Sequence, residues 1–301
     1  MANLNSERTK VLPLFIADAF TKKPFSGNPA AVCLLPSNYD IDSCTKQKIA
    51  AEMNLSETAF PKIIKDGDTF QNGKRFALEW FTPKCQVPLC GHATIATSAV
   101  LFAECGNESE VIEFETLSGI LKAKRLSDNR IEMDFPAYES KSVMGKCDEL
   151  VKAIVKDLPV QDVVFSSSAR MYLIQLSDNV TRKQFEEIKT NDAELLAAEP
   201  GDVIGVIVTL KGSEKNCIDE EGNSYDFLSR FFAPWSGVTE DPVCGSAHCV
   251  LAPYWAKILS KEDFYGRFCS RRGGNVYIRL VNDRILLSGH AAVVVKGQLH
   301  M

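Results

Sequence analysis

The hexapeptide "PLCGHA" at Pro88–Ala93 recurs as "PVCGSA" at Pro242–Ala247, 154 residues further along the chain. Each copy stands directly before an apolar run that is rich in small residues, "TIATSAVLFA" and "HCVLAPYWA". Self-similarity at a fixed spacing is the signature of a duplicated structural unit. The two copies therefore predict two halves with one plan, each with a helix that starts at the motif.

The same register extends beyond the motif. At a spacing of 154 residues Phe114 matches Phe268 and Gly119 matches Gly273, while "RFALEWFTP" (75–83) matches "DFLSRFFAP" (226–234) at a spacing of 151. The change of spacing indicates three extra residues in the second loop before the motif. Chance alignment of common residues is the alternative, but a register that holds this far along the chain favours duplication.

Hydrophobic periodicity predicts an α+β fold. Small and apolar residues surround the whole of the predicted helix at 90–104, as expected of a helix buried inside a sheet or barrel. Strands are expected around 57–64, 76–81, 111–116, 120–125 and 130–135, and again near 265–269, 275–281, 284–288 and 291–295. We therefore predict two pseudo-symmetric halves, 11–131 and 132–301, each a curved sheet or barrel around one central helix. Pro253 should kink the second helix.

Composition excludes several classes of protein. Hydrophobic residues make up 45% of the 301 residues and charged residues 24%, as in globular proteins. A net charge of −5 without a Lys/Arg stripe argues against a nucleic-acid partner. No run reaches the roughly 18 apolar residues of a membrane span, and the polar first ten residues lack the apolar region of a secretory signal. Together with ten cysteines and no sign of export, this predicts a cytoplasmic protein with reduced thiols and no membrane contact.

The repeated motif can bind an anion. Backbone N–H groups in the first turn of a helix have no partners and carry a partial positive charge. Glycine at such a position, here Gly91 and Gly245, lets a ligand approach the backbone closely. Two such helix starts that face each other would hold a small carboxylate in a cleft between the halves. The alternative is that glycine and alanine only allow tight packing at the start of each helix.

The two motif cysteines allow a second hypothesis. A thiol at a helix N-terminus has a lowered pKa, so Cys90 and Cys244 could act as the facing bases of a racemase or epimerase. They could equally be small buried hydrophobes. A zinc site is not predicted, because Cys85 precedes the first motif cysteine whereas Cys249 follows the second, so the two cysteine pairs do not correspond.

Four segments resemble the PhzF family of phenazine-biosynthesis-like isomerases, which has the diaminopimelate epimerase-like fold. They are "DAFTKKPFSGNPAAVCLL" (18–35), "NLSETAF" (54–60), "WFTPKCQVPLCGHATIA" (80–96) and "GVTEDPVCGSAH" (237–248). The resemblance covers about residues 11–298, keeps the family order and is greatest to the animal branch of the family. It implies an isomerase without a metal or organic cofactor that forms a homodimer.

The resemblance also implies site residues. Glu57 would be the catalytic acid/base that moves a proton between carbons of a cyclohexadiene carboxylate. The residues implied to bind and orient that substrate are Gly91, His92, Asp241, Gly245 and Ser246. To exchange protons near neutral pH, Glu57 needs a raised pKa, from apolar burial or from a neighbouring carboxylate such as Asp241.

The chain departs from the family pattern at two positions. Phenazine-forming members have no cysteine where Cys90 and Cys244 stand, and the two-cysteine arrangement resembles the epimerase branch of the fold. That branch has Asn and Thr after its two Cys-Gly pairs, whereas this chain has His92 and Ser246. We therefore expect Glu57 chemistry with both cysteines packing the helix starts. A two-cysteine racemase and a catalytically silent interaction protein stay open as alternatives, and the native substrate is open because the animal branch has no phenazine pathway.

Overall fold

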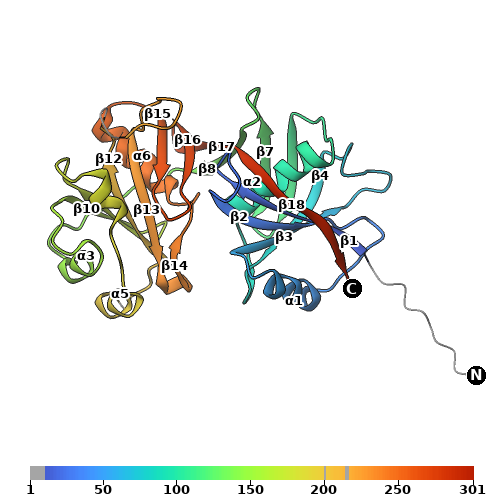
Figure 1. The fold of residues 1–301 in the computed structure, drawn as a ribbon, viewed down its shortest axis with the longest axis horizontal. Helices are drawn as coiled ribbons and strands as arrows, with labels where there is room; N and C mark the ends of the chain where they lie inside the picture. The colour runs from blue at the N-terminus through green and yellow to red at the C-terminus, as the bar shows by residue number, and fades with distance from the viewer. Residues whose placement is uncertain (1–10, 200, 214–216) are drawn as a thin grey trace, which may run out of the picture. The chain divides into compact units, whose positions relative to one another are not determined.

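The computed structural model describes residues 11–199, 201–213 and 217–301 and has the predicted α+β architecture. Contacts between residues group the described chain into two compact units (Figure 1). The first unit contains residues 11–19, 29–131 and 291–301, and the second contains residues 20–28 and 132–290. Among the described residues, no helix has the length and apolar character needed to cross a bilayer.

The first unit is a mixed sheet that covers one buried helix. Its strands are β1 (Val11–Ala19), β2 (Asn28–Cys33), β3 (Glu57–Ile63), β4 (Arg75–Phe81), β5 (Gln86–Val87), β6 (Val111–Thr116), β7 (Gly119–Arg125) and β18 (Ala291–His300). They pair in the order β18-β1-β2-β3-β4-β6-β7, with β2–β3 and β4–β6 parallel and β5 beside β4. Helix α1 (Ser43–Met53) packs on β3 and β4.

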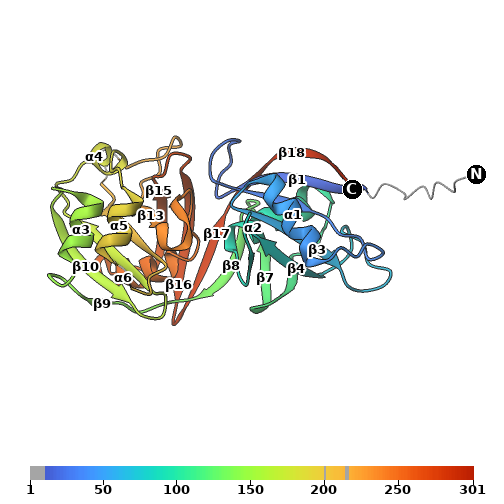
Figure 2. The same cartoon turned by 90° about the horizontal axis from the view of Figure 1, so that it is seen from below.

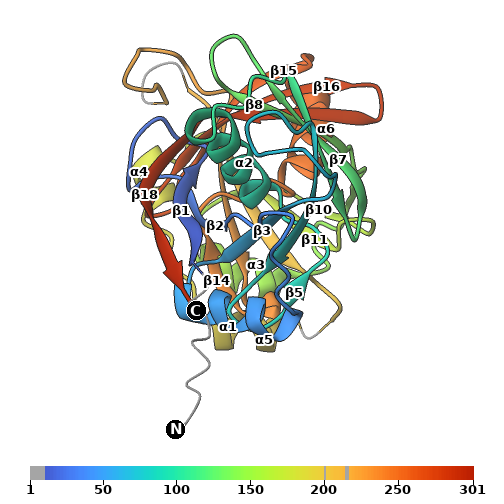
Figure 3. The same ribbon diagram turned by 90° about the vertical axis from the view of Figure 1, so that its right-hand side faces the viewer.

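The central helix of this unit is α2 (Gly91–Ala99), which continues as a π-helical turn over Val100–Glu104. It contacts β1, β3, β7 and β18, and Figure 3 shows it between the β1–β18 pair and β7. Every residue from 92 to 99 is buried. The hydroxyls of Thr94, Thr97 and Ser98 donate to carbonyls four residues back, so the buried polar groups are satisfied inside the helix itself. The predicted buried helix is confirmed.

The second unit has the same kind of sheet. Its strands are β8 (Ile131–Pro136), which begins at the last residue of the first unit, β9 (Lys141–Ser142), β10 (Val160–Ser166), β11 (Met171–Leu176), β12 (Gly205–Lys211), β13 (Phe227–Ala233), β14 (Val238–Asp241), β15 (Asp263–Phe268), β16 (Gly274–Val281) and β17 (Arg284–Gly289). They pair in the order β9-β10-β11-β12-β13-β15-β16-β17-β8, with β14 also on β13.

In the described part of the second unit there are four α-helices. Helix α6 (His248–Leu259) contacts β16 and β17. Helices α3 (Asp148–Val155), α4 (Arg182–Glu186) and α5 (Asp192–Ala198) complete the unit, and α3 and α5 lie side by side in Figure 2. Leu150, Phe185 and Leu195, one from each of these three helices, are buried in a single apolar cluster with the sheet.

The strand pairings repeat between the units. In the first, β2–β3 is parallel, β3–β4 antiparallel, β4–β6 parallel and β6–β7 antiparallel. In the second, β11–β12, β12–β13, β13–β15 and β15–β16 follow the same sequence of orientations. The short strands β5 and β14 lie beside corresponding strands, β4 and β13. This shared plan agrees with the duplication that the sequence repeat predicts.

The units differ from the predicted halves in two segments. Strand β18 pairs with β1 from Val11 to Ala19, which places residues 291–301 in the first unit although the prediction assigned them to the second half. Residues 20–28 belong to the second unit, where the backbone N–H of Asn275 donates to the Phe20 carbonyl at 2.9 Å. Such pairings join distant parts of the chain, and no local pattern predicts them.

The second central helix starts later than predicted. The backbone N–H groups of His248 and Cys249 donate to carbonyls three residues back, so residues 245–247 form a tight turn and α6 begins at His248. Pro253 lies inside α6 and has no N–H to offer the Cys249 carbonyl. That carbonyl instead accepts the backbone N–H of Tyr138 at 2.7 Å, so the missing helical bond is replaced by a bond to the segment after β8.

Candidate active site

Glu57 is the first residue of β3. The turn before it begins at Asn54, which caps the end of α1 in the left-handed conformation (φ 50°). Glu57 then pairs with Ala30 of β2 in parallel register, and the hydroxyl of the preceding Ser56 donates to the Pro29 carbonyl at 3.2 Å. These contacts fix the backbone from which the Glu57 side chain projects.

Cys90 and His92 stand at the start of α2. Cys90 occupies the N-cap in an extended conformation (φ −147°, ψ 109°), and its side chain makes no capping hydrogen bond. Its carbonyl accepts both the backbone N–H of Thr94 at 3.2 Å and the Thr94 hydroxyl at 2.6 Å. His92 follows in the first turn and is buried. The motif therefore fixes both side chains at the N-terminal end of a buried helix.

The imidazole of His92 lies between a carboxylate and a thiol. Its Nε2 atom is 3.1 Å from Oε2 of Glu57, and its Nδ1 atom is 3.4 Å from Sγ of Cys90. The side chains of His92 and Glu57 are 8% and 17% exposed. Although they are close, Nε2 and Oε2 are poorly aligned, and each is a buried polar atom without a well-directed hydrogen bond. Native proteins rarely leave such atoms unsatisfied, so the pair has hydrogen-bonding capacity to offer a ligand.

The pair is ionised. Burial acts to raise the pKa of Glu57, but the charge of His92 and the nearby polar groups of His92, Cys90 and Ser56 outweigh it and hold that pKa below its ordinary value. Burial acts to lower the pKa of His92, but its interactions with Cys90 and Glu57 raise it well above 6.5. The expected raised pKa of Glu57 is therefore wrong for the ligand-free protein, because the imidazolium beside the carboxylate dominates over burial.

The Cys90 thiol is neutral. Burial raises its pKa above the ordinary value, and the negative charge of Glu57 adds to that effect. The predicted lowering of a thiol pKa at a helix start does not hold here, because Cys90 is only 7% exposed. Cys90 therefore contacts His92 as a protonated thiol.

The cluster also brings three potential metal ligands together. Ligand atoms of Glu57, Cys90 and His92 lie within 4.8 Å of one another. The carboxylate and the thiol, however, approach opposite nitrogens of the one imidazole ring. A cation bound to either nitrogen would have one of the other two groups on the far side of the ring. This arrangement suits proton movement through the cluster better than coordination of one ion.

Asp241 lies at the end of β14 in the second unit. Its Oδ1 atom accepts the side-chain amide of Asn28 at 2.7 Å and the backbone N–H of Val243 at 3.1 Å. The same Asn28 amide also donates to the Val243 carbonyl at 3.1 Å, and Asn28 is fully buried. Asn28 thus positions Asp241. In the sequence Asn28 stands out only as part of the family segment at 18–35, and nothing there indicates this role.

The second motif has its own local network. Sγ of Cys244 lies 3.3 Å from Oγ of Ser246, and burial together with the charge of Asp241 raises the pKa of Cys244 well above its ordinary value. Nδ1 of His248 lies 3.0 Å from the Cys244 carbonyl, and burial lowers the pKa of His248 to about 4. His248 is therefore a neutral structural histidine at neutral pH.

Gly245 has room for a side chain. A Cβ atom at this position would meet Leu287 and Phe20 at 3.6 and 3.8 Å, which are ordinary contact distances. Tight packing therefore does not explain why glycine stands at this position. The alternative from the sequence, that glycine lets a ligand approach the backbone, remains open.

The predicted site residues thus form two groups. Glu57, Cys90, Gly91 and His92 meet in the first unit, and Asp241, Cys244, Gly245 and Ser246 meet in the second. The expectation that both groups serve one substrate stays a prediction.

Comparisons with known proteins agree with these motifs. The family model described as "PhzC-PhzF: Phenazine biosynthesis-like protein" matches residues 17–297. The chain is 46% identical over 291 residues to phenazine biosynthesis-like domain-containing protein 1 of Mus musculus, covering 96% of this chain and 99% of that protein. It is 39% identical over 288 residues to an uncharacterized isomerase of Halalkalibacterium halodurans, covering 95% and 98%.

A solved structure shares the fold. The crystal structure of a PhzF-family phenazine biosynthesis protein from Enterococcus faecalis matches with a TM-score of 0.80 and 33% identity, covering 97% of this chain and all of that one. The repeated strand order, the two Cys-Gly motifs and these full-length similarities lead to one conclusion: the chain belongs to the PhzC-PhzF family of phenazine biosynthesis-like proteins.

Proposed function

We propose that this protein is a cofactor-independent isomerase that moves a proton between carbons of a small carboxylate-bearing substrate, with Glu57 as the acid/base. The observation that carries the proposal is the buried Glu57–His92 pair, whose facing atoms lack well-directed hydrogen bonds. The bacterial relative that is 39% identical carries the name uncharacterized isomerase, which supports the same class of reaction.

The proton first leaves a substrate carbon. In the ligand-free protein His92 is charged and holds Glu57 as a carboxylate, which is the form that accepts a proton. When the C–H bond breaks, an O–H bond forms on Glu57 and the electron pair moves into the conjugated system of the substrate. The imidazolium of His92 and the N–H groups at the start of α2 then stabilise the negative charge on the substrate carboxylate.

The proton then returns to a different carbon. Once the charge of His92 is shared with a substrate anion, burial dominates at Glu57 and raises its pKa, so the protonated carboxyl becomes stable enough to deliver its proton. The O–H bond breaks, a new C–H bond forms and the double bond takes a new position. No electrons are gained or lost overall, so the reaction needs no redox partner.

The side chains on the second unit complete the proposal. Asp241, held by Asn28, and Ser246, which is exposed at the turn before α6, are proposed to bind the polar groups of the substrate, with Gly91 and Gly245 giving it access to the backbone. A homodimer, as the family resemblance implies, and a cytoplasmic location, as the composition and cysteine usage predict, remain part of the proposal.

The competing hypotheses are less well supported. A two-thiol racemase needs thiolates, but burial raises the pKa of both Cys90 and Cys244. A catalytically silent interaction protein predicts that Glu57 is held in an internal ion pair. Glu57 does pair with a basic residue, but that residue is His92, which is itself implied to bind substrate.

Proton exchange with solvent tests the proposal. A panel of cyclohexadiene carboxylates in deuterium oxide should acquire deuterium on carbon in the presence of the protein, as followed by NMR. Glu57→Gln should abolish the exchange. Glu104→Gln is the matched control, because Glu104 lies in the same unit, pairs with Lys296 and is also 17% exposed. Exchange that survives in Glu57→Gln would remove the assignment.

A further inference from the structure

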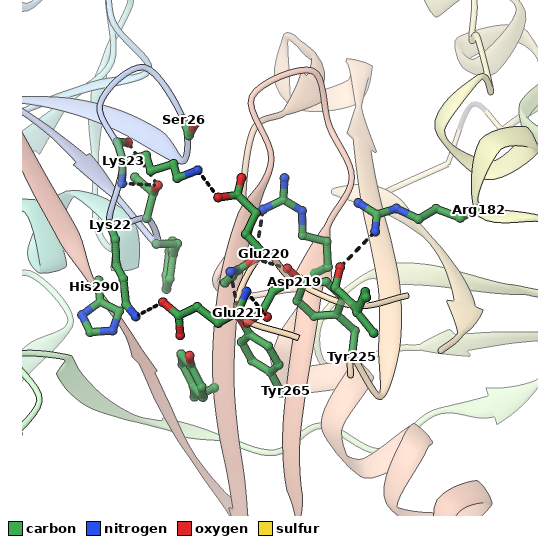
Figure 4. A pocket seen from close by; sticks show the side chains of 16 residues that line it. Lys22, Lys23, Ser26, Arg182, Asp219, Glu220, Glu221, Tyr225, Tyr265 and His290 are labelled. Atoms are coloured by element: carbon green, nitrogen blue, oxygen red, sulfur yellow. Dashed lines mark hydrogen bonds and ion pairs between the residues drawn. The ribbon is translucent and has the colours of Figure 1, made fainter. Parts of the chain in front are cut away.

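The second unit contains a cavity of about 300 Å³ whose lining includes none of the predicted site residues (Figure 4). One side is formed by residues 20–23 and 26, and another by residues 218–221. The floor comes from side chains of β15 and β16. The volume is at the lower limit of small-molecule sites, so the cavity fits one small ring.

The floor lies on the face of the sheet that points away from α6. Along β15, Phe264 and Phe268 are buried, and Phe268 contacts the ring of His248 in α6. Successive strand residues point to opposite faces, so Tyr265 and Arg267 point the other way, into the cavity. On β16 the register places Tyr277 opposite Tyr265 and Asn275 opposite Arg267. The sheet therefore separates the cavity from α6.

Three tyrosines form a continuous aromatic wall. The rings of Tyr225 and Tyr265 are 4.8 Å apart, and those of Tyr265 and Tyr277 are stacked at 4.5 Å with an angle of 23°. Asn275 fixes two of them, because the Tyr225 hydroxyl donates to its Oδ1 at 3.0 Å and its Nδ2 donates to the Tyr265 hydroxyl at 2.8 Å. Because Tyr265 is covered by the rings of both neighbours, the ring faces left for a ligand belong to Tyr225 and Tyr277.

The acidic groups of the cavity already have partners. Asp219 closes its own turn by accepting the backbone N–H groups of Glu221 and Asn223, and it also accepts the Tyr265 hydroxyl at 2.9 Å. At the mouth Glu221 pairs with Lys22 at 2.8 Å and Glu220 pairs with Lys23, as the dashed lines in Figure 4 show. The side chains of both pairs are 52% exposed or more, so these ion pairs contribute little stability.

Arg267 is the cation left without an acidic partner. Its Nη1 donates to Oδ1 of Asn275 at 2.9 Å, and within the described ranges 11–199, 201–213 and 217–301 no carboxylate forms an ion pair with it. The guanidinium lies against Gly273, whose φ is +65° and where any Cβ would overlap Nη2. Glycine at this position therefore leaves space for the arginine beside the tyrosine wall.

We propose that this cavity binds a planar aromatic carboxylate, with its ring against Tyr277 and its carboxylate on Arg267. A guanidinium presents N–H donors in a fork that matches a carboxylate, and an aromatic wall favours a flat ring over a saturated one. A cationic ligand is disfavoured because the nearby carboxylates are engaged and the uncompensated charge is positive. The proposal does not depend on Glu57 chemistry.

Fluorine NMR of the full chain with 4-fluorobenzoate tests the proposal. The probe should bind saturably, whereas 4-fluorobenzylamine should not, and cyclohexanecarboxylate should compete at least about tenfold more weakly than benzoate. Arg267→Met should weaken the probe about tenfold or more, and Arg267→Lys by less, because the charge is kept while the fork is lost. Tyr277→Leu should weaken binding through loss of the ring contact.

The controls separate this site from the candidate active site. Arg279→Met removes an arginine from the same face of β16 that pairs with Asp263 and does not line the cavity, so binding should be unchanged. Glu57→Gln should also leave binding unchanged. Circular dichroism and the unfolding midpoint establish that each variant is folded. The proposal would be overturned if the probe did not bind saturably or if the amine bound equally well. It would also be overturned if a folded Arg267→Met variant bound the probe fully, or if Glu57→Gln lost binding.

Discussion

Nε2 of His92 lies 3.1 Å from Oε2 of Glu57, and both atoms are buried in the first unit. This contact holds the pKa of the Glu57 carboxyl below its ordinary value, although burial alone would raise that pKa. A ligand that draws the charge of His92 away would thus change the proton affinity of Glu57. In the proposed mechanism, the binding of an anion beside His92 therefore controls the proton affinity of Glu57.

Removal of His92 should reverse the pKa shift of Glu57. In His92→Gln the imidazolium is gone and burial remains, so the pKa of Glu57 should rise above its ordinary value of 4.5. The expected destabilisation is about 1–3 kcal/mol, because a buried carboxylate loses its charged partner. Carboxyl-carbon NMR of labelled glutamate measures the pKa, and urea unfolding measures the free energy. A pKa that stays below 4.5 would contradict the account of this pair.

The same pair sets the pH dependence of stability. The folded-state pKa of Glu57 is lowered, so its contribution is present above 4.5 and is lost as the pH falls through the lower folded value. The folded-state pKa of His92 is raised, so its contribution is full below 6.5 and is lost as the pH rises through the higher folded value. The difference in unfolding free energy between the wild type and a Glu57→Gln/His92→Gln double variant should therefore be largest between about pH 4.5 and 6.5.

Urea titrations across that range measure the difference. The matched Glu104→Gln variant loses an exposed lysine partner instead, and it should not reproduce the high-pH decline that belongs to the histidine. A difference that is constant from acid to alkaline pH would mean that the pair is not ionised.

The position of Asp241 should depend on Asn28. Asn28→Ala removes the amide that joins Asp241 to the Val243 carbonyl and leaves buried polar groups unsatisfied, so unfolding should become easier by about 1–3 kcal/mol. Asp241→Asn keeps an oxygen that can accept the Asn28 amide, so its loss of stability should be smaller. Equal destabilisation by the two variants would argue against the proposed positioning role.

The buried thiols should react slowly. Because burial raises the pKa of Cys90 and Cys244, iodoacetamide at pH 7.5 should label the exposed Cys44 and Cys85 first, as read by mass spectrometry of timed digests. Cys90→Ala and Cys244→Ala should change proton exchange by less than about tenfold if neither thiol is a base. Early labelling of both motif cysteines, or a loss of exchange as large as that in Glu57→Gln, would favour the two-cysteine racemase.

The sequence predicts those parts of the fold that local patterns determine. The small and apolar residues around 92–99 indicate a buried helix, and the repeated register indicates two units of one plan, as found. Strand β18 was expected, but its partner β1 lies at the other end of the chain. The late start of α6 follows from the tight turn over residues 245–247, for which the periodicity gives no sign.

The candidate site, too, can be predicted from the sequence only in part. Family resemblance identifies Glu57 and His92, but their separation of 3.1 Å and the resulting pKa shifts depend on the packing of β3 against α2. Asn28 and Asp241 are 213 residues apart in the chain, so nothing local joins them. The alternation of Tyr265 with Arg267 and of Asn275 with Tyr277 marks one face of two strands, yet only the strand register places the four side chains around one cavity.

Isotope transfer is the most direct test of the claim that Glu57 moves a proton between two carbons of the substrate. A substrate that carries deuterium on the donor carbon is converted in ordinary water, and the label in the product is read by mass spectrometry. If one carboxyl removes and redelivers the same proton, the wild type and a Cys90→Ala/Cys244→Ala variant should both pass part of the label to the acceptor carbon, and Glu57→Gln should form no product. Product formation by a folded Glu57→Gln variant at the wild-type rate would contradict the account.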